Sequence, residues 1–208
     1  MGLFTDPNNN FTVYDVPKGG GTTVRSWIAF AGTGEYQLAG SDTYYHENPT
    51  AYKLLDEWGY KCVFFEEVAG DRICIKRDPV ERFISCYKDK VIKEGRLPGV
   101  SIDDLLNNFE ETISKNDQPH PSNKDVGYLW FHFAPQARQL GTDYDYYTHV
   151  FDISEVGTKV KAYLEGKWDI VLPDLHCRNN KSSIVKLTDT QVSKIKEIYS
   201  EDYQTGWF

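Results

Sequence analysis

The sequence lacks several features that would place it in a common class at once. No apolar run reaches the ~18 residues that a membrane-spanning helix needs. Lysine and arginine number 23 against 31 acidic residues, and the net charge of −8 argues against a general nucleic-acid binder, which should be basic. The N-terminal MGLFTDPNNN has no basic stretch followed by an apolar one, so we expect no signal peptide. These absences predict a soluble, cytoplasmic protein that binds neither membranes nor nucleic acids.

The four cysteines show no spacing typical of a metal site, and we expect no bound metal. Cys74 and Cys86 fall in apolar stretches, where a free cysteine behaves as a small hydrophobic residue. Two disulfides are the alternative, but nothing else in the sequence indicates secretion. We therefore expect reduced thiols.

A run of three glycines stands out in FTVYDVPKGGGTTVRSW, residues 11–27. The segment predicts a strand over 11–16 and a helix over 22–31, which makes the glycines part of the turn between them. Glycine lets backbone N–H groups converge on an anion, and a helix N-terminus adds about half a positive charge. The residues expected to form this anion cradle are Lys18, Gly19, Gly20, Gly21, Thr22 and Thr23.

This turn differs from two familiar phosphate loops. In the loop of nucleotide triphosphatases the lysine follows the glycines, whereas Lys18 precedes them. The dinucleotide fingerprint fits poorly because its sixth position is Val24. A glycine turn that only reverses the chain is the other interpretation, but such a turn needs neither the lysine nor the two threonines.

The rest of the chain alternates between strands and helices. Strands are predicted over 35–45, 60–67, 72–76 and 149–153, and helices over 48–59, 79–91, from Ser101, from Ser154 to about Leu164 and over 188–203. The polar segment 116–125 is predicted to be a surface loop. This alternation predicts an α/β fold with a central, mainly parallel sheet flanked by helices. The turns at 17–22 and 77–79 should then share the edge where strands end, which is where such sheets bind ligands.

The second of these turns carries its own phosphate signal. In RDPVERFISCYKDKV, residues 77–91, Asp78 is the expected N-cap of a helix and Glu81 completes a capping box. Arg77, at a strand end beside a helix N-terminus, is a suitable phosphate ligand. Ser85 lies two turns further on, about 10 Å along the helix. An ion pair of Arg77 with Asp78 or Glu81 is the alternative.

Both segments resemble motifs of one family. The order strand, Pro-Lys-x-x-x-Thr-Thr, helix resembles the 5′-phosphosulfate loop of sulfotransferases that use 3′-phosphoadenosine 5′-phosphosulfate (PAPS). Residues 75–91 resemble the 3′-phosphate motif of that family, in a form similar to the Golgi-type carbohydrate sulfotransferases. HFAPQARQL (132–140) and residues 179–203 resemble further segments of the same group, while about 92–127 is not matched.

The resemblance implies a P-loop-like, three-layer fold and a single sulfotransferase domain over 1–208. Its 5′-phosphosulfate loop would be 16–25, its 3′-phosphate motif 72–91, and its C-terminal closing segment 176–203. The implied activity is metal-free transfer of a sulfuryl group from PAPS to a hydroxyl acceptor. The implied PAPS ligands are the cradle residues, Arg77, Ser85, Arg178, Lys181 and Ser182, with Lys18 also acting at the leaving phosphate. Golgi relatives carry a membrane anchor and a longer catalytic domain, so their compartment is not carried over.

The acceptor hydroxyl needs a general base. The position that family members use points to His46, whose ordinary pKa of about 6.5 suits the task. Glu66 and Glu67, which follow an apolar run, are alternatives, as is His132. We order them His46, then Glu66, then His132. The corresponding structural interpretations are an exposed loop histidine for His46, a solvated strand end or an ion pair with Arg72 for the two glutamates, and a hydrogen-bonded core histidine for His132.

The acidic net charge disfavours a heavily sulfated acceptor, because repulsion would slow the encounter. A neutral or lightly charged carbohydrate, or a small hydroxylated molecule, fits better. Two other functions stay open. A non-catalytic member would bind PAPS or a glycan without transfer. A nucleotide kinase is disfavoured by the position of Lys18, and because no aspartate is convincingly placed to bind magnesium.

Overall fold

The structure is a computed structural model that describes residues 2–6, 8–34, 61–62, 67–121, 123–175 and 185–208. The strand expected at 35–45, the helix expected at 48–59 and most of the strand expected at 60–67 lie outside the described residues. Among the described helices, none has the length and apolar character needed to cross a bilayer.

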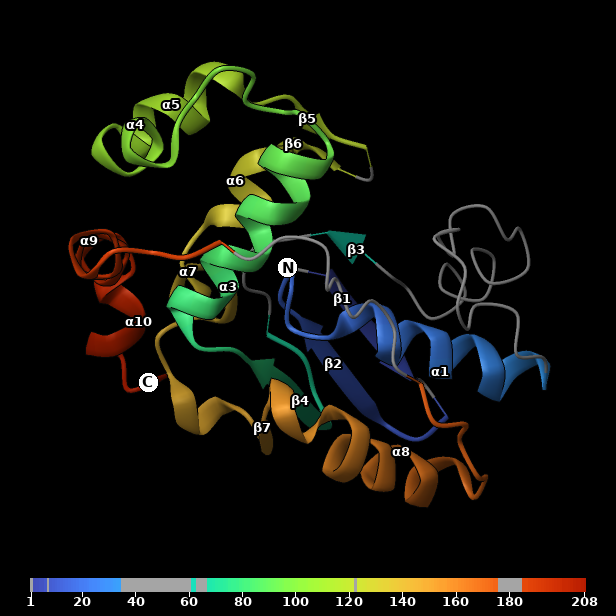
Figure 1. The fold of residues 1–208 in the computed structure, drawn as a ribbon. Helices are drawn as coiled ribbons and strands as arrows, with labels where there is room; N and C mark the ends of the chain where they lie inside the picture. The colour runs from blue at the N-terminus through green and yellow to red at the C-terminus, as the bar shows by residue number, and fades with distance from the viewer. Residues whose placement is uncertain (1, 7, 35–60, 63–66, 122, 176–184) are drawn as a thin grey trace.

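A five-stranded sheet forms the centre of the molecule, in the order β3-β1-β2-β4-β7 (Figure 1). The strands are β1 (Gly2–Asp6), β2 (Phe11–Asp15), β3 (Lys61–Cys62), β4 (Asp71–Lys76) and β7 (His149–Asp152). β2, β4 and β7 are mutually parallel, and β1 runs antiparallel to both of its neighbours. The predicted fold class is therefore confirmed: a mostly parallel sheet is flanked by helices.

The two faces of the sheet are covered by different helices because side chains alternate along each strand. Val13 and Ile73 face a buried cluster that α1 (Gly21–Thr33) shares with α8 (Lys161–Trp168). Tyr14 and Cys74, their neighbours in the sequence, belong to a second cluster on the opposite face. That second cluster includes Ala137 and Leu140 of α7 (Gln136–Leu140), together with Leu3 and Trp207.

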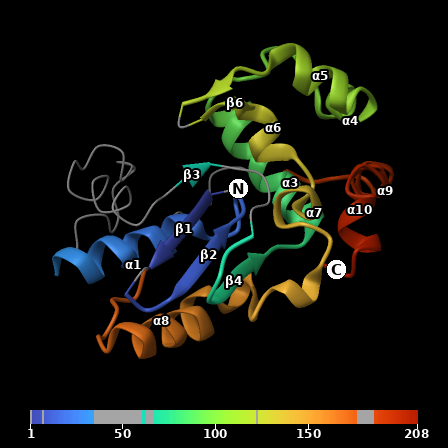
Figure 2. The same cartoon turned by 180° about the vertical axis from the view of Figure 1, so that it is seen from behind.

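The remaining helices pack around one another beside the sheet (Figures 1 and 2). α3 (Pro79–Cys86) continues as a π-helical segment, η2 (Tyr87–Lys93). The others are α4 (Ile102–Asn107), α5 (Phe109–Asn116), α6 (Tyr128–Phe133), α9 (Asp189–Ile198) and α10 (Ser200–Gln204). Phe83, Phe109, Phe133 and Tyr199 form the aromatic centre of this helical core.

Several element boundaries differ from the sequence prediction. The helix expected from Ser101 breaks at Asn108 into α4 and α5, and the helix expected over 188–203 breaks at Tyr199 into α9 and α10. The helix expected from Ser154 begins as a short 3-10 turn, η4 (Ile153–Glu155), and a π-helical turn, η5 (Val156–Val160), before α8. The segment 144–146 forms one further 3-10 turn, η3 (Tyr144–Tyr146). β1 was not predicted.

The prediction of a surface loop over 116–125 is wrong. The segment forms a small hairpin of β5 (Pro119–His120) and β6 (Asn123–Gly127). Asp117 fastens this hairpin, since its carboxylate accepts hydrogen bonds from Leu129 N at 2.6 Å and Trp130 N at 3.1 Å in the first turn of α6.

Candidate active site

The two turns singled out in the sequence meet at one edge of the sheet. β2 and β4 are parallel neighbours, so both strands end at that edge. Arg77, just after β4, donates a hydrogen bond from Nη1 to the carbonyl oxygen of Lys18 at 3.1 Å. The expectation that both turns share one edge of the sheet is thus confirmed by a direct contact.

Each of the three glycines lies where a side chain would clash with its surroundings or strain the backbone. A Cβ at Gly19 would lie 2.9 Å from the carbonyl oxygen of Val16 and 3.0 Å from that of Ile75. Gly20, the N-cap of α1, has a φ of 94°, which side chains rarely adopt. A Cβ at Gly21 would lie 1.8 Å from the carboxylate of Asp15. The glycines therefore let the loop lie directly against the sheet and open a helix there.

The buried carboxylate beneath Gly21 pairs with a cation of α1. Asp15 is 6% exposed and forms an ion pair with Arg25 of α1. Burial raises the pKa of Asp15, and Arg25 partly offsets that rise. This pair joins the end of β2 to the second turn of α1, which fixes where the helix N-terminus lies.

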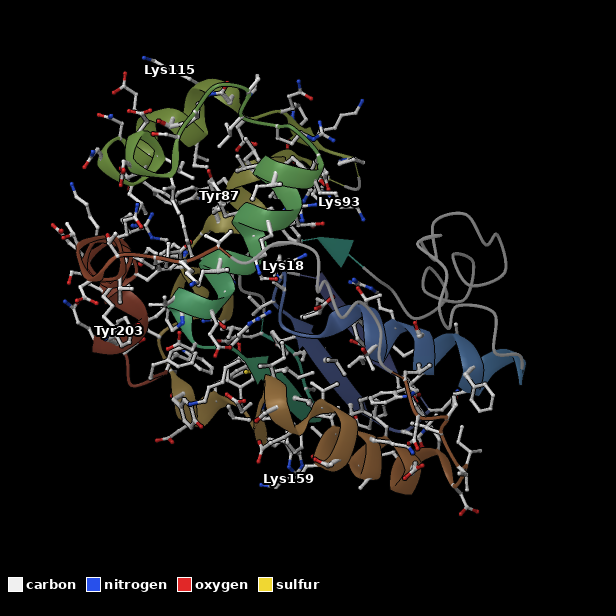
Figure 3. All side chains as sticks on the ribbon, viewed as in Figure 1. Lys18, Tyr87, Lys93, Lys115, Lys159 and Tyr203 are labelled. Atoms are coloured by element: carbon white, nitrogen blue, oxygen red, sulfur yellow. The ribbon has the colours of Figure 1, made fainter. Side chains whose placement is uncertain are left out.

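Lys18 projects from the sheet edge toward α3, near the middle of the molecule (Figure 3). Its φ of 69° is unusual for a residue with a side chain. Its ammonium pairs with Asp89 Oδ2 at 2.9 Å, and Lys90 Nζ lies 3.1 Å from the same oxygen. Burial pushes the pKa of Asp89 upward, but the two lysines outweigh it and hold that pKa well below its usual range. The carboxylate is therefore ionised at neutral pH.

Arg77 is held by its backbone as well as by its side chain. Gln136 accepts a hydrogen bond from Arg77 N at 3.0 Å and donates one to Arg77 O at 2.8 Å. The side-chain Nε is 3.7 Å from Glu81, so the weak ion pair considered from the sequence is present. Asp78 caps α3 as predicted, accepting from Glu81 N at 3.0 Å. Ser85 lies partly buried on the same helix.

Sequence reasoning missed Arg82, which is fully buried behind the loop. Arg82 Nε donates to the carbonyl oxygen of Pro17 at 3.2 Å, and Nη2 donates to those of His132 at 2.9 Å and Ala134 at 2.8 Å. It thereby ties the residue before Lys18 to the end of α6. A signal existed: Arg82 lies three residues after Pro79 and four before Cys86, a helical spacing that places it beside the apolar face.

Several predicted site residues fall outside the described residues: His46, Glu66, Arg178, Lys181 and Ser182. Of the remaining candidate bases, Glu67 is exposed. His132 Nδ1 lies 2.7 Å from the carbonyl oxygen of Tyr128. Burial lowers the pKa of His132 well below its usual value, and Lys90 lowers it further. Because a carbonyl only accepts, Nδ1 carries the proton and Nε2 of the neutral ring is an acceptor.

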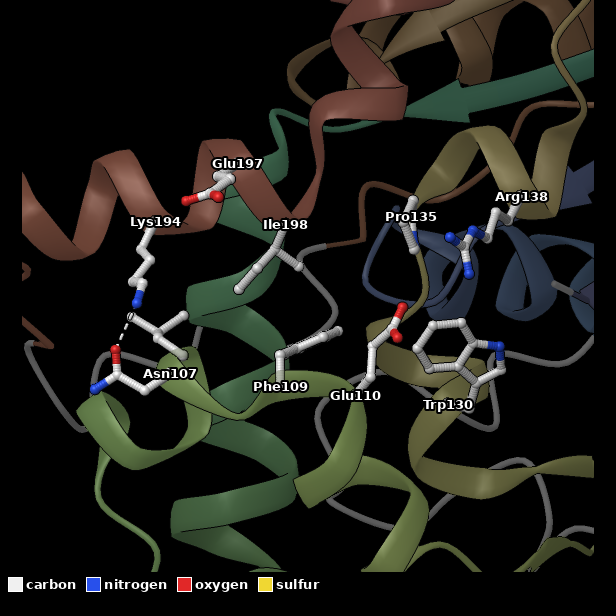
Figure 4. A pocket seen from close by; sticks show the side chains of 10 residues that line it. Asn107, Phe109, Glu110, Trp130, Pro135, Arg138, Lys194, Glu197 and Ile198 are labelled. Atoms are coloured by element: carbon white, nitrogen blue, oxygen red, sulfur yellow. Dashed lines mark hydrogen bonds between the residues drawn. The ribbon is translucent and has the colours of Figure 1, made fainter.

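One pocket of about 350 Å³ lies elsewhere, among α4, α5, α6, α7 and α9 (Figure 4). Its walls include Phe109, Trp130 and Ile198, and Lys194 Nζ donates across it to Asn107 Oδ1 at 2.6 Å. No residue of the glycine loop lines it, so it is not the anion cradle.

No group of three or more histidine, cysteine or acidic side chains in the described ranges is arranged to hold a metal ion. Comparison with known proteins gives one positive result. No curated protein and no solved structure matches the chain. The model of the sulfotransferase family matches residues 1–205, which is nearly the whole sequence.

Proposed function

This chain belongs to the sulfotransferase family, whose members transfer sulfuryl groups, and from that premise we propose that its donor is PAPS, bound at the sheet edge where Lys18 and Arg77 meet. The observation that carries the proposal is the contact between these two residues. They come from turns far apart in the sequence, yet Arg77 Nη1 reaches the Lys18 carbonyl at 3.1 Å. One cation beside a glycine loop and a second beside a helix N-terminus suit a ligand with two separated anionic groups.

The residues present fit such a ligand. Arg77 Nε is buried and donates no hydrogen bond within the described part of the chain, which leaves a guanidinium donor for a phosphate oxygen. The 13-residue helix α1 begins at Gly21 and directs its first N–H groups toward the loop. On this proposal Lys18, Gly19, Gly20, Gly21, Thr22 and Thr23 hold the 5′-phosphosulfate. Arg77 and Ser85 hold the 3′-phosphate.

Bound PAPS would supply the sulfuryl group, which passes in line to an acceptor hydroxyl as negative charge develops on the 5′-phosphate oxygen. The Lys18 ammonium is the group that stabilises that charge. The loop backbone fixes the position of the phosphate, and Arg82 in turn fixes the loop through Pro17. A base must take the proton of the acceptor hydroxyl.

For the base, we keep the order His46, Glu66, His132, with Glu67 as a further alternative. What supports His132 is its tautomer, since an unprotonated Nε2 on a neutral ring is able to accept a proton. The proposed acceptor is a neutral or lightly charged carbohydrate or a small hydroxylated molecule. Residues 176–203, which include Arg178, Lys181 and Ser182, are proposed to close over the donor.

The test is a melting experiment with adenosine 3′,5′-bisphosphate, the product that PAPS would leave, against ADP, ATP and buffer. At about 100 times Kd, one-site binding adds about 2.7 kcal/mol. For a chain of this size we expect a rise in Tm of about 5–10 °C. Lys18→Ala and Arg77→Ala should each reduce the rise, and an equal rise with ATP would contradict the proposal.

A further inference from the structure

A chain of alternating charges runs inward from Lys18. Asp89 Oδ2 accepts from Lys18 at 2.9 Å and lies 3.1 Å from Lys90 Nζ. Lys90 also donates to Glu94 Oε1 at 2.6 Å and to the hydroxyl of Tyr128 at 2.7 Å. Asp89 and Lys90 are 3% and 4% exposed, so this is an interior network and not a set of surface ion pairs.

The π-helical segment η2 places both residues inside. Its wider turn is closed by the hydrogen bond from Glu94 N to Asp89 O at 2.9 Å, five residues apart. Consecutive residues of a helix point in different directions, yet Asp89 and Lys90 are both buried here. Single π turns within helices are frequent at functional sites. The segment holds the Asp89 carboxylate in a fixed place opposite the glycine loop.

Lys18 keeps donors to spare beside Asp89. The ammonium groups of Lys18 and Lys90 share the Asp89 carboxylate, and Lys90 is also paired with Glu94 at 2.6 Å. An ammonium has three donors, and the bond to Asp89 uses one of them. Lys18 is therefore able to keep Asp89 while donating to an anion in the loop.

Both ends of Lys18 are restrained. Its backbone carbonyl accepts from Arg77 at 3.1 Å, and its ammonium is bonded to Asp89 at 2.9 Å. Without the carboxylate, the ammonium groups of Lys18 and Lys90 would face each other with no anion between them. Like charges at such short range repel strongly in a partly buried site, so Lys18 would turn away.

We propose that Asp89 is a positioning residue that aims the Lys18 ammonium at the 5′-phosphate of the donor. The inference rests on the proposed function, because it assumes that the glycine loop binds that phosphate. The opposite outcome is physically reasonable: a carboxylate that only competes for Lys18 would weaken anion binding, and removing it would strengthen binding. The sign of the effect of Asp89→Asn therefore decides between the two.

The experiment is calorimetric and needs no acceptor. The Kd of adenosine 3′-monophosphate divided by that of adenosine 3′,5′-bisphosphate measures what the 5′-phosphate adds to binding. This ratio is determined for the wild type, Asp89→Asn, Lys18→Met and the double variant. Asp89→Glu is included because it keeps the charge. Glu94→Gln is the matched control, since Glu94 bonds to Lys90 and Tyr128 in the same network.

We expect Asp89→Asn and Lys18→Met each to lower the ratio about tenfold. Lys18→Met removes the charge-assisted contact to the 5′-phosphate, and Asp89→Asn loses it because the Lys18 ammonium is no longer held in place. The double variant should match Lys18→Met, since Asp89 has nothing left to position. Asp89→Glu should recover part of the ratio, and Glu94→Gln should leave it within about twofold. Binding of the 3′-monophosphate should be unchanged in all of them.

Three results would overturn the inference. A higher ratio in Asp89→Asn would make Asp89 a competitor for Lys18. An equal loss of affinity for both nucleotides would make its role structural. If Asp89→Asn does not fold, an Asp89→Glu variant that loses equal affinity for both nucleotides would have the same meaning. A wild type that binds neither nucleotide would instead overturn the proposed function, and this inference with it.

Discussion

At Gly21, the first residue of α1, an added methyl group would lie 1.8 Å from the Asp15 carboxylate. Alanine is the better helix former, so propensity alone predicts that Gly21→Ala is stabilising. We expect the opposite, a loss of about 1–3 kcal/mol in the free energy of unfolding, because Asp15 is buried and tied to Arg25. Urea denaturation measures this loss.

The matched control is Gly166→Ala in α8, where a Cβ would meet nothing within 4 Å. Here the helix propensity should prevail and raise stability by about 0.5–1 kcal/mol. Similar effects at the two positions would show that the close approach to Asp15 does not constrain the loop.

His132 makes stability depend on pH. Its pKa lies well below the ordinary value in the folded protein, because burial and the nearby Lys90 and Lys18 disfavour the charged ring. Below pH about 6.5 the unfolded chain therefore binds more protons than the folded one, and the free energy of unfolding falls as pH decreases.

We expect His132→Gln to reduce the loss of stability between pH 7 and pH 5.5, by up to about 1.4 kcal/mol per pH unit. Chemical denaturation at the two pH values gives the difference. The control is His149→Gln, on β7, outside the cluster around Lys18. The same pH dependence in wild type and His132→Gln would contradict the burial of a neutral ring.

At the scale of residues, type and spacing were enough to single out Lys18 and Arg77, which the structure brings into contact. A cation beside a glycine turn is typical of an anion site, and so is a cation between a strand end and a helix cap. The partner of Lys18 could not be predicted from the sequence, because Asp89 is 71 residues away and contacts Lys18 only where η2 packs against the loop. The helical spacing of Arg82 indicated a position beside the apolar face, but no pattern reveals its acceptors, which are backbone carbonyls.

At the scale of elements, the Asp117 carboxylate helps to hold the hairpin β5–β6 against α6. Asp117 accepts from Leu129 N and Trp130 N, so it satisfies N–H groups that a helix start leaves without partners. Asp117→Ala should lower the free energy of unfolding by about 1–2 kcal/mol, and thermal or urea denaturation will show it.

Asp125→Ala, an exposed change on β6 of the same hairpin, is the control and should have an effect within about 0.5 kcal/mol. Equal effects would indicate that the segment behaves as the loose polar loop predicted from its composition.

The elements with clear end signals were predicted well. Asp78 and Ser101 both cap helices as expected, Ser101 in a full capping box with Asp104. The breaks at Asn108 and Tyr199 were not predictable from apolar spacing, which continues through both. β1 and the hairpin were missed because short strands are defined by their partners more than by their own residues.

At the scale of the whole molecule, the buried thiols of Cys74 and Cys86 report on opening of the fold. Both are fully buried, and burial raises the pKa of each thiol. Native protein should be alkylated at these two positions at least about 100-fold more slowly than unfolded protein, because reaction needs a thiolate and access. Mass mapping of peptides after timed alkylation measures each site separately. Rapid labelling of either position under native conditions would contradict the packing described here.

The cluster on the second face of the sheet joins the two ends of the sequence, since Leu3, Tyr14 and Trp207 pack together. Trp207 is fully buried, its ring nitrogen donates to Gly141 O at 3.0 Å, and its carbonyl oxygen accepts from Lys76 at 2.7 Å. During synthesis β1 and β2 leave the ribosome before Trp207 is made. In a nascent chain, that face of the sheet must therefore stay exposed to solvent until Trp207 has been made. Nascent intermediates that lack Trp207 will expose an apolar surface that chaperones recognise.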